Sequence, residues 1–227
     1  MTLRLARDAF LRGYRMAYRG AAADDAGALL RAVGALDPDL APFAFEGAAM
    51  AWTVREARER SVRFDDLVTS AEIRWRPFLA LGMGCAQARL GRPIPDEAAA
   101  QDGYGFLHGL LDRSWRPGGE GTSRRVERGR GRALWFTTEG DAEACRRLIG
   151  DGACVSDRWR GVAIACAFAG DPRGHASLLP RAAGDRDVVA EGAREALRLW
   201  RSLGTPPRRV LEAVEAVEAV DRGPAPQ

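Results

Sequence analysis

The chain has 227 residues, of which 46% are hydrophobic and 29% charged, so it can bury one large core or two small ones. The 34 basic and 31 acidic residues give a net charge of +3, which is too small to make the whole surface attractive to nucleic acid. Every basic residue is arginine, so catalysis through a lysine Schiff base is excluded.

The cysteines and the N-terminal residues indicate the cellular setting. The four cysteines are widely spaced and form no CxxC pair, so we expect free, buried thiols. Residues 1–20 contain arginine throughout and lack the apolar core of a signal peptide. The longest apolar run, at 78–86, is much shorter than the roughly 20 residues that cross a bilayer. We therefore expect a cytoplasmic bacterial protein without a membrane span.

Apolar and small residues recur at helical spacing through most of the chain, whereas strand signals are scarce. In the first half the pattern predicts an amphipathic helix near 5–17 and a second one capped by Asp24 or Asp25. Pro38 and Pro42 are expected to end this hairpin. A third helix is expected near 45–60, with Glu46 in its first turn, and a fourth after Pro77.

The middle of the chain reads as an arginine- and glycine-rich loop at 114–132, where six arginines and two glutamates give +4. Further helices are expected near 141–149, 157–169, 186–203 and 207–221, followed by a disordered tail at 222–227. The sequence thus predicts a single all-α domain over 1–221, either a helical bundle or an array of α-hairpins.

Two pairs of segments have a similar texture and raise the hypothesis of an internal duplication, with halves 1–113 and 133–221. The glycine- and alanine-rich stretch at 78–89 resembles 160–170, and 45–51 resembles 190–196. Small-residue helices also arise by chance in an alanine-rich chain.

One candidate site lies at 102–109, where an acid, a hydroxyl and an imidazole occur among three glycines. Tyr104 and His108 are four residues apart and would share a helix face, with Asp102 near the start of that helix. Imidazole suits proton transfer near neutral pH. The plain structural alternative is a capping aspartate and a hydrogen-bonded core histidine.

Two other patterns give weaker signals. Arg128, Arg130 and Arg132 alternate with glycine, so an extended segment would present their guanidiniums on one side to an anion; a solvated loop is the alternative. Asp65 and Asp66, followed by Glu72, superficially resemble a magnesium–diphosphate cluster, although an aspartate pair before a helix is usually a cap. Zinc is not expected, because His175 has no partner at metal-ligand spacing.

Seven blocks, in a consistent order, resemble a bacterial family known as domain of unknown function family 1702, whose genes often lie in enediyne polyketide cassettes. The blocks are FLRGY at 10–14, FAFEGAAM at 43–50, LGMGCAQARL at 81–90, DGYGF at 102–106, GRGRALWF at 129–136, RWRGVAIACAFAG at 158–170 and EGA at 191–193. The resemblance implies a role in specialised-metabolite biosynthesis, with a hydrophobic polyene or polyketide as ligand.

The polar residues within these blocks are the ones that packing alone does not require. We predict that Asp102, His108 and Glu46 are catalytic and that the substrate contacts further side chains. These are Tyr104, Arg89, Arg132, Trp135 and Arg158.

The favoured hypothesis is an antibiotic-biosynthesis enzyme that needs no cofactor and rearranges or cyclises a hydrophobic intermediate. The first alternative is a non-catalytic helical scaffold or chaperone for an intermediate or for partner enzymes. The second is an unusual isoprenoid cyclase, in which Asp65, Asp66 and Glu72 would hold magnesium.

Overall fold

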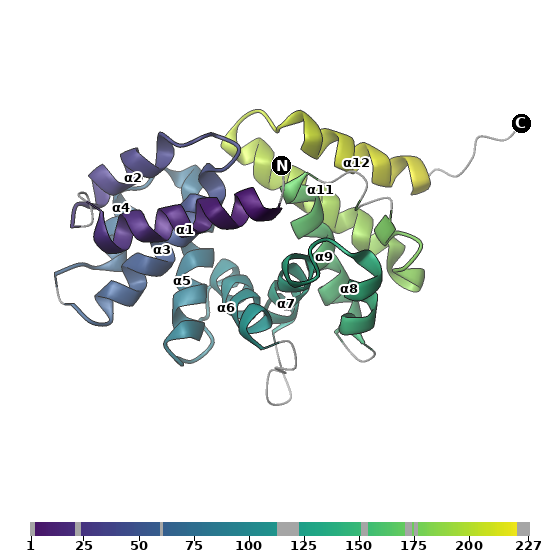
Figure 1. Cartoon of the computed structure of the whole chain (residues 1–227), viewed down its shortest axis with the longest axis horizontal. Helices are drawn as coiled ribbons and strands as arrows, with labels where there is room; N and C mark the ends of the chain where they lie inside the picture. Colours follow the sequence, from purple (N-terminus) through teal and green to yellow (C-terminus); the bar gives the residue numbers. More distant parts are fainter. Residues whose placement is uncertain are drawn as a thin grey trace, which may run out of the picture. The chain divides into compact units, whose positions relative to one another are not determined.

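The computed structural model describes residues 3–20, 24–59, 61–112, 123–150, 154–170, 174 and 177–221, and these contain helices and no strand (Figure 1). The all-α prediction is confirmed. The helices are α1 (Leu3–Arg19), α2 (Ala26–Gly34), α3 (Ala41–Glu56), α4 (Phe64–Ser70), α5 (Arg76–Arg89), α6 (Ala98–Leu111), α7 (Arg124–Thr137), α8 (Ala142–Ile149), α9 (Val155–Ala169), α11 (Arg186–Leu203) and α12 (Arg208–Asp221), with 3-10 turns η1 (Ile73–Trp75) and η2 (Ala183–Asp185).

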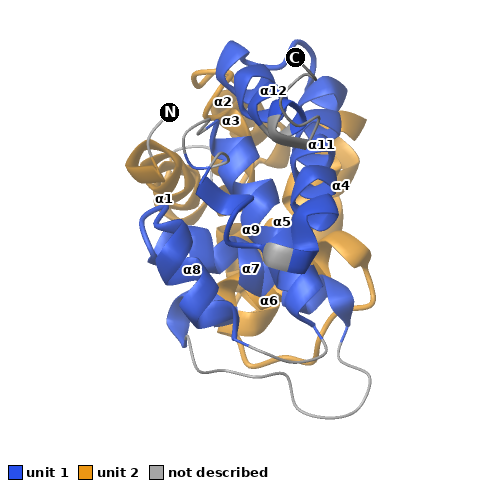
Figure 2. Cartoon of the chain, turned by 90° about the vertical axis from the view of Figure 1, so that its right-hand side faces the viewer, with its two compact units in different colours: residues 1, 108–227 blue, residues 2–107 orange. Residues whose placement is uncertain are grey.

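The chain forms two compact units, residues 2–107 and residues 108–227, coloured orange and blue in Figure 2. In the N-terminal unit, α1 packs on α3 and α3 packs on α5. In the C-terminal unit, α7 packs on α9 and α9 packs on α11. The boundary between the units falls within α6.

Glycines bring the helices of the N-terminal unit together at backbone distance. A Cβ atom on Gly13 of α1 would lie 1.9 Å from the carbonyl oxygen of Ala44 on α3. In the reverse direction, a Cβ on Gly47 of α3 would lie 2.0 Å from the oxygen of Phe10. Only glycine allows backbones to approach this closely, so these residues determine where α1 and α3 cross.

The C-terminal unit repeats this arrangement with its own glycines. A Cβ on Gly131 of α7 would lie 2.0 Å from the oxygen of Arg158, and one on Gly161 of α9 would lie 1.9 Å from that of Arg128. Gly192 of α11 likewise packs on Arg160 of α9. Helices α7, α9 and α11 thus correspond to α1, α3 and α5.

This correspondence differs from the one that the sequence suggested. The texture of 78–89 resembles that of 160–170, but the former lies in α5 and the latter in α9, whose counterpart is α3. The two segments have similar compositions because small residues recur in every helix that packs closely, so the similarity does not identify corresponding helices. The duplication itself stays a prediction.

The arginine- and glycine-rich loop expected at 114–132 is wrong for residues 124–132, which form the first nine residues of α7. Ser123 caps this helix by accepting a hydrogen bond from the backbone N–H of Arg125. Gly131, one of the glycines that suggested a loop, is a contact glycine that lies against α9. Residues 113–122 and the tail at 222–227 lie outside the described residues.

Several predicted helix boundaries are confirmed, and one is wrong. Asp25 caps α2, and α8, α9, α11 and α12 lie where the periodicity placed them. Helix α3, however, begins at Ala41, because Pro42 occupies its first turn rather than ending the preceding hairpin. Glu46 therefore lies in the second turn of a helix that is buried on every side.

The cores contain the side chains that the pattern placed there, including Met50 and Trp52. All four cysteines are free; Cys85, Cys145 and Cys166 are buried, whereas Cys154 is half-buried. Among the described residues, no helix has the length and apolar character that a bilayer crossing demands.

Candidate functional site

The predicted site residues divide equally between the two units. The N-terminal unit holds Glu46 on α3, Arg89 on α5, and Asp102 and Tyr104 on α6. The C-terminal unit holds His108 on α6, Arg132 and Trp135 on α7, and Arg158 on α9.

Asp102 is the fifth residue of α6, and its side chain is buried, with 5% of the residue exposed. The plain alternative, a capping aspartate, is therefore wrong. The neighbouring Gly103 lies against α5, where a Cβ would be 1.9 Å from the oxygen of Leu81. Burial of a carboxylate costs free energy unless polar contacts compensate for it. Apolar packing alone therefore gives no reason for an aspartate at this position.

Tyr104 and His108 lie four residues apart on α6 and share a face of the helix, as the spacing predicted. The phenol of Tyr104 donates a hydrogen bond to the carbonyl oxygen of Arg92, 3.1 Å away, and burial raises its pKa. Tyr104 thus ties α6 to the segment that follows α5.

His108 is half-buried, and burial lowers its pKa below the ordinary value of 6.5, against a smaller opposing effect of Asp112. Burial thus favours the neutral imidazole, which is the form that can accept a proton. Gly109 packs against Ala133 of α7, which holds this part of the helix backbone in place.

Asp102 and His108 do not share a helix face. Six residues separate them, which on an α-helix corresponds to about 9 Å along the axis and about 120° around it. A direct proton transfer between the two side chains is excluded by this spacing, so they would have to act at different atoms of a substrate.

Glu46 and Arg89 lie in different settings on the α3–α5 pair. Glu46 is only 3% exposed, and its backbone oxygen lies against Gly82 of α5. Arg89 is the last residue of α5 and is exposed, so it is open to a solute.

Arg158 is held inside the C-terminal unit by an ion-paired triad. Its Nε atom lies 2.5 Å from Oε2 of Glu127, and its Nη1 donates to the carbonyl oxygen of Ile149. Arg130 binds the same carboxylate at 3.1 Å. All three charged residues are buried, so Arg158 holds α7 and α9 together and does not face solvent.

Trp135 is completely buried and contributes to packing. Its ring lies 3.2 Å from the Cβ position of Gly140, which follows α7 with a positive φ of 83°. Within the described part of the chain, its indole N–H has no hydrogen-bond partner. Arg132, on the preceding turn of α7, is half-buried.

A second ion-paired group, which sequence reasoning missed, surrounds Glu195 of α11. Arg128 of α7 binds one carboxylate oxygen at 2.7 Å, and Arg160 of α9 binds the other at 2.9 Å. The expected anion-binding row of Arg128, Arg130 and Arg132 is thus wrong for the first two, because helical spacing directs them to internal carboxylates.

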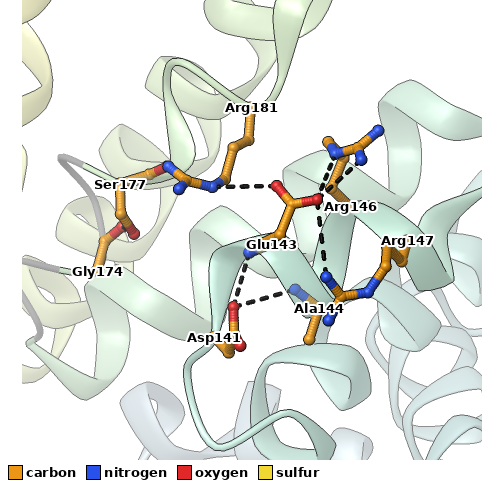
Figure 3. A network of polar contacts seen from close by, with 8 residues as sticks. All are labelled: Asp141, Glu143, Ala144, Arg146, Arg147, Gly174, Ser177 and Arg181. Carbon is orange, nitrogen blue, oxygen red and sulfur yellow. Dashed lines mark hydrogen bonds and ion pairs between the residues drawn. The ribbon is translucent and has the colours of Figure 1, made fainter.

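A more exposed network links α8 to the segment before η2 (Figure 3). Glu143 lies between Arg146, Arg147 and Arg181, at 2.8, 3.8 and 3.3 Å. The hydrogen bond from Arg146 is the main reason that the pKa of Glu143 is lowered. Asp141 caps α8 through the N–H groups of Glu143 and Ala144. This network stabilises the start of α8.

Two of the three acidic residues considered for magnesium form ion pairs with neighbouring arginines. Asp65 lies 3.8 Å from Arg63, and Glu72 lies 2.9 Å from Arg74. Within the described residues, no group of three or more histidine, cysteine, aspartate or glutamate side chains is placed to hold a metal ion. His175 lies outside the described residues.

A profile of the family described as "Protein of unknown function (DUF1702)" matches residues 2–220. The chain belongs to this family. No curated protein and no solved structure matches the chain. The match to the DUF1702 family extends over both units of the chain.

Of the eight predicted site residues in this DUF1702 chain, the structure gives a packing role to Trp135 and Arg158 and a tethering role to Tyr104. Arg89 is exposed, whereas His108 and Arg132 are half-buried and the Nε2 atom of His108 is buried. The roles predicted for these three residues stay proposals.

Proposed function

We propose that the protein is a cofactor-free enzyme of specialised metabolism that rearranges or cyclises a hydrophobic polyene or polyketide intermediate. The chain belongs to the DUF1702 family, and the biosynthetic setting that the sequence resemblance implies is part of this proposal. The observation that carries the reaction type is the half-buried position of the His108 imidazole on a helix whose backbone is held by Gly109, where burial lowers the pKa of the imidazole.

A neutral imidazole at neutral pH is a proton acceptor, and acid–base chemistry is sufficient for double-bond migration, enolisation and many cyclisations. Asp102, buried on another face of α6, is the proposed partner that acts at a different substrate atom. Glu46 keeps its proposed catalytic role, and Arg89 and Arg132 keep theirs as substrate contacts.

A second candidate function is a non-catalytic scaffold or chaperone for the intermediate or for partner enzymes. The observation that favours it is the structural use of polar residues within the family blocks: Arg158 binds Glu127, and Trp135 is buried in the core. An isoprenoid cyclase is less favoured, because Asp65 and Glu72 lie next to arginines instead of one another.

The experiment that separates the two is metabolite profiling of a host that carries the surrounding gene cluster. The host receives the wild-type chain, His108→Ala or the control Arg201→Ala, which changes an exposed residue of α11. Soluble protein is matched between strains.

An enzyme predicts that His108→Ala accumulates one discrete precursor, whose mass difference from the product gives the reaction type, whereas Arg201→Ala yields product normally. An unchanged profile for His108→Ala removes this residue from the mechanism. If deletion of the whole gene then only reduces the yield without a discrete precursor, the scaffold is the better description.

A further inference from the structure

Two tyrosines on the second half of α1 form a stacked aromatic pair. The rings of Tyr14 and Tyr18 are stacked, with centroids 5.7 Å apart and an interplanar angle of 17°. Both residues are half-buried, so part of each ring is open to solvent. Their spacing of four residues puts them on one face of the helix.

Guanidinium groups surround these rings. Arg58, which follows α3, donates from Nη1 to the hydroxyl oxygen of Tyr18 at 3.0 Å. Arg19 lies over the ring of Tyr18, 5.9 Å from its centroid. Burial and the neighbouring Tyr18 raise the pKa of Tyr14, whereas the charges of Arg58 and Arg89 act to lower it, so both guanidiniums lie within electrostatic range of its phenol.

The carboxylates of this region are engaged elsewhere. Asp24 and Glu59, which follow α1 and α3, both bind Arg55, at 2.5 and 2.8 Å. Glu56 accepts a hydrogen bond from the backbone N–H of Phe64. Within the described residues of the N-terminal unit, no carboxylate pairs with Arg19, Arg58 or Arg89, and all three are exposed.

Three arginines that pair with no carboxylate of the described residues, beside a stacked pair of tyrosine rings, form an arrangement that recognises an anion attached to a planar or apolar body. Guanidinium groups match the geometry of phosphate and carboxylate oxygens, and the phenols add hydrogen bonds. The remainder of such a ligand would gain contact area on the stacked rings.

We propose that the phenol–guanidinium cluster, formed by Tyr14, Tyr18, Arg19, Arg58 and Arg89, binds the phosphate or carboxylate group of a small molecule whose planar part lies on the tyrosine rings. The site lies entirely within the N-terminal unit. It shares Arg89 with the proposed substrate contacts of the enzyme but does not depend on the role of His108.

The test is isothermal titration calorimetry of the full chain with four probes, namely inorganic phosphate, pyrophosphate, acetate and benzoate, at constant ionic strength. The test variant Arg58→Gln/Arg89→Gln removes two cluster charges. The control variant Arg186→Gln/Arg201→Gln removes two charges from exposed positions on α11. Circular dichroism verifies that each variant is folded, and Tyr14→Phe removes a hydroxyl while it keeps the ring stack.

We expect at least one probe to bind the wild-type chain at one site, with affinity lowered about tenfold or more in the cluster variant and less than about twofold in the control. Tyr14→Phe should weaken binding more than the control does. A preference for phosphate and pyrophosphate would identify a phosphorylated ligand. A preference for benzoate over acetate would identify a ligand that carries a carboxylate on a planar body.

The proposal is overturned if no probe binds, if the cluster variant binds as well as the wild type, or if the control weakens binding equally. The last result would mean attraction to overall charge. His108→Ala should bind the probe normally, so failure of the enzymatic proposal and failure of this one are separate results.

Discussion

Glu127 shows how a single residue holds two helices of the C-terminal unit. Its carboxylate lies between the guanidiniums of Arg130 and Arg158, and all three side chains are removed from solvent. Buried ion pairs add little net stability over apolar packing, but removal of one partner leaves uncompensated charge in the interior. Glu127 therefore matters mainly because its loss would leave the buried charges of Arg130 and Arg158 without a counter-charge.

Glu127→Gln should destabilise the chain by about 3–5 kcal/mol, because two buried arginines would lose their counter-charge. The matched control is Glu212→Gln, which breaks the exposed Arg208–Glu212 pair and should cost less than about 1 kcal/mol. Urea unfolding followed by circular dichroism measures both. Equal losses in the two variants would show that the triad is dispensable.

His108 should make stability depend on pH in a defined direction. Because its folded pKa lies below the ordinary 6.5, the unfolded chain binds the proton more readily. This residue's stabilising contribution is complete above about pH 6.5 and is lost as pH falls through the folded pKa.

The advantage of the wild type over His108→Gln in unfolding free energy should thus be larger at pH 7.5 than at about pH 5. Urea titrations at the two pH values give the comparison. If the difference in unfolding free energy between the two proteins stays constant, or grows on acidification, burial does not lower the pKa of His108.

At the scale of the element, helices cross through glycine pairs. Gly13 and Gly47 join α1 to α3, and Gly131 and Gly161 join α7 to α9, each facing a carbonyl oxygen of the partner helix. Glycine lowers the intrinsic stability of a helix by roughly 1 kcal/mol relative to alanine, so close packing must compensate for it at each crossing.

Gly47→Ala should destabilise the protein by about 1–3 kcal/mol or more, since its Cβ would lie 2.0 Å from the oxygen of Phe10. Gly184→Ala in η2 is the control, because no heavy atom lies within 4 Å of its Cβ position. We expect the control to change stability by less than about 0.5 kcal/mol. Thermal unfolding measures the stability of both variants. Similar melting temperatures would show that Gly47 is not required where α1 and α3 cross.

Element-level patterns were more readable in the sequence than the meaning of individual glycines. Apolar periodicity predicted α9 and α11 almost to their boundaries, because each buries one continuous set of residues. Residues 124–132 read as a loop because a glycine that allows a close contact looks the same as one that forms a turn. Pro42 was ambiguous in a similar way, because a proline can end one helix or occupy the first turn of the next.

The candidate site was less predictable, because polar side chains find partners far away in the chain. Arg128 binds Glu195, 67 residues later, which no local spacing reveals. Local geometry did work where both residues lie on one helix, as for Tyr104 and His108. Tyr14 and Tyr18 show the same spacing, and attention to it would have found the aromatic pair on α1.

At the scale of the whole molecule, the chain consists of two units that each pack three central helices in the same order. Each unit has its own core, with Trp52 buried in one and Trp159 in the other. Separate cores generally act as separate cooperative regions in local unfolding.

Hydrogen exchange measured by mass spectrometry should reveal this division. Gly47→Ala is expected to accelerate exchange in α1, α3 and α5 more than in α7, α9 and α11, and Gly161→Ala should do the reverse. Uniform acceleration of all six helices by either variant would show that the chain opens as one body.

The glycine crossings also restrict how each unit can move. If α1 slid along α3 by one helical turn, a residue with a side chain would replace Gly47 at the contact with α1, and the helices would collide. Shear between packed helices is a common route of conformational change, and here it is blocked at the crossing point. Any ligand-driven rearrangement must therefore carry α1 and α3, or α7 and α9, as rigid pairs, with the bending confined to the segments that connect them.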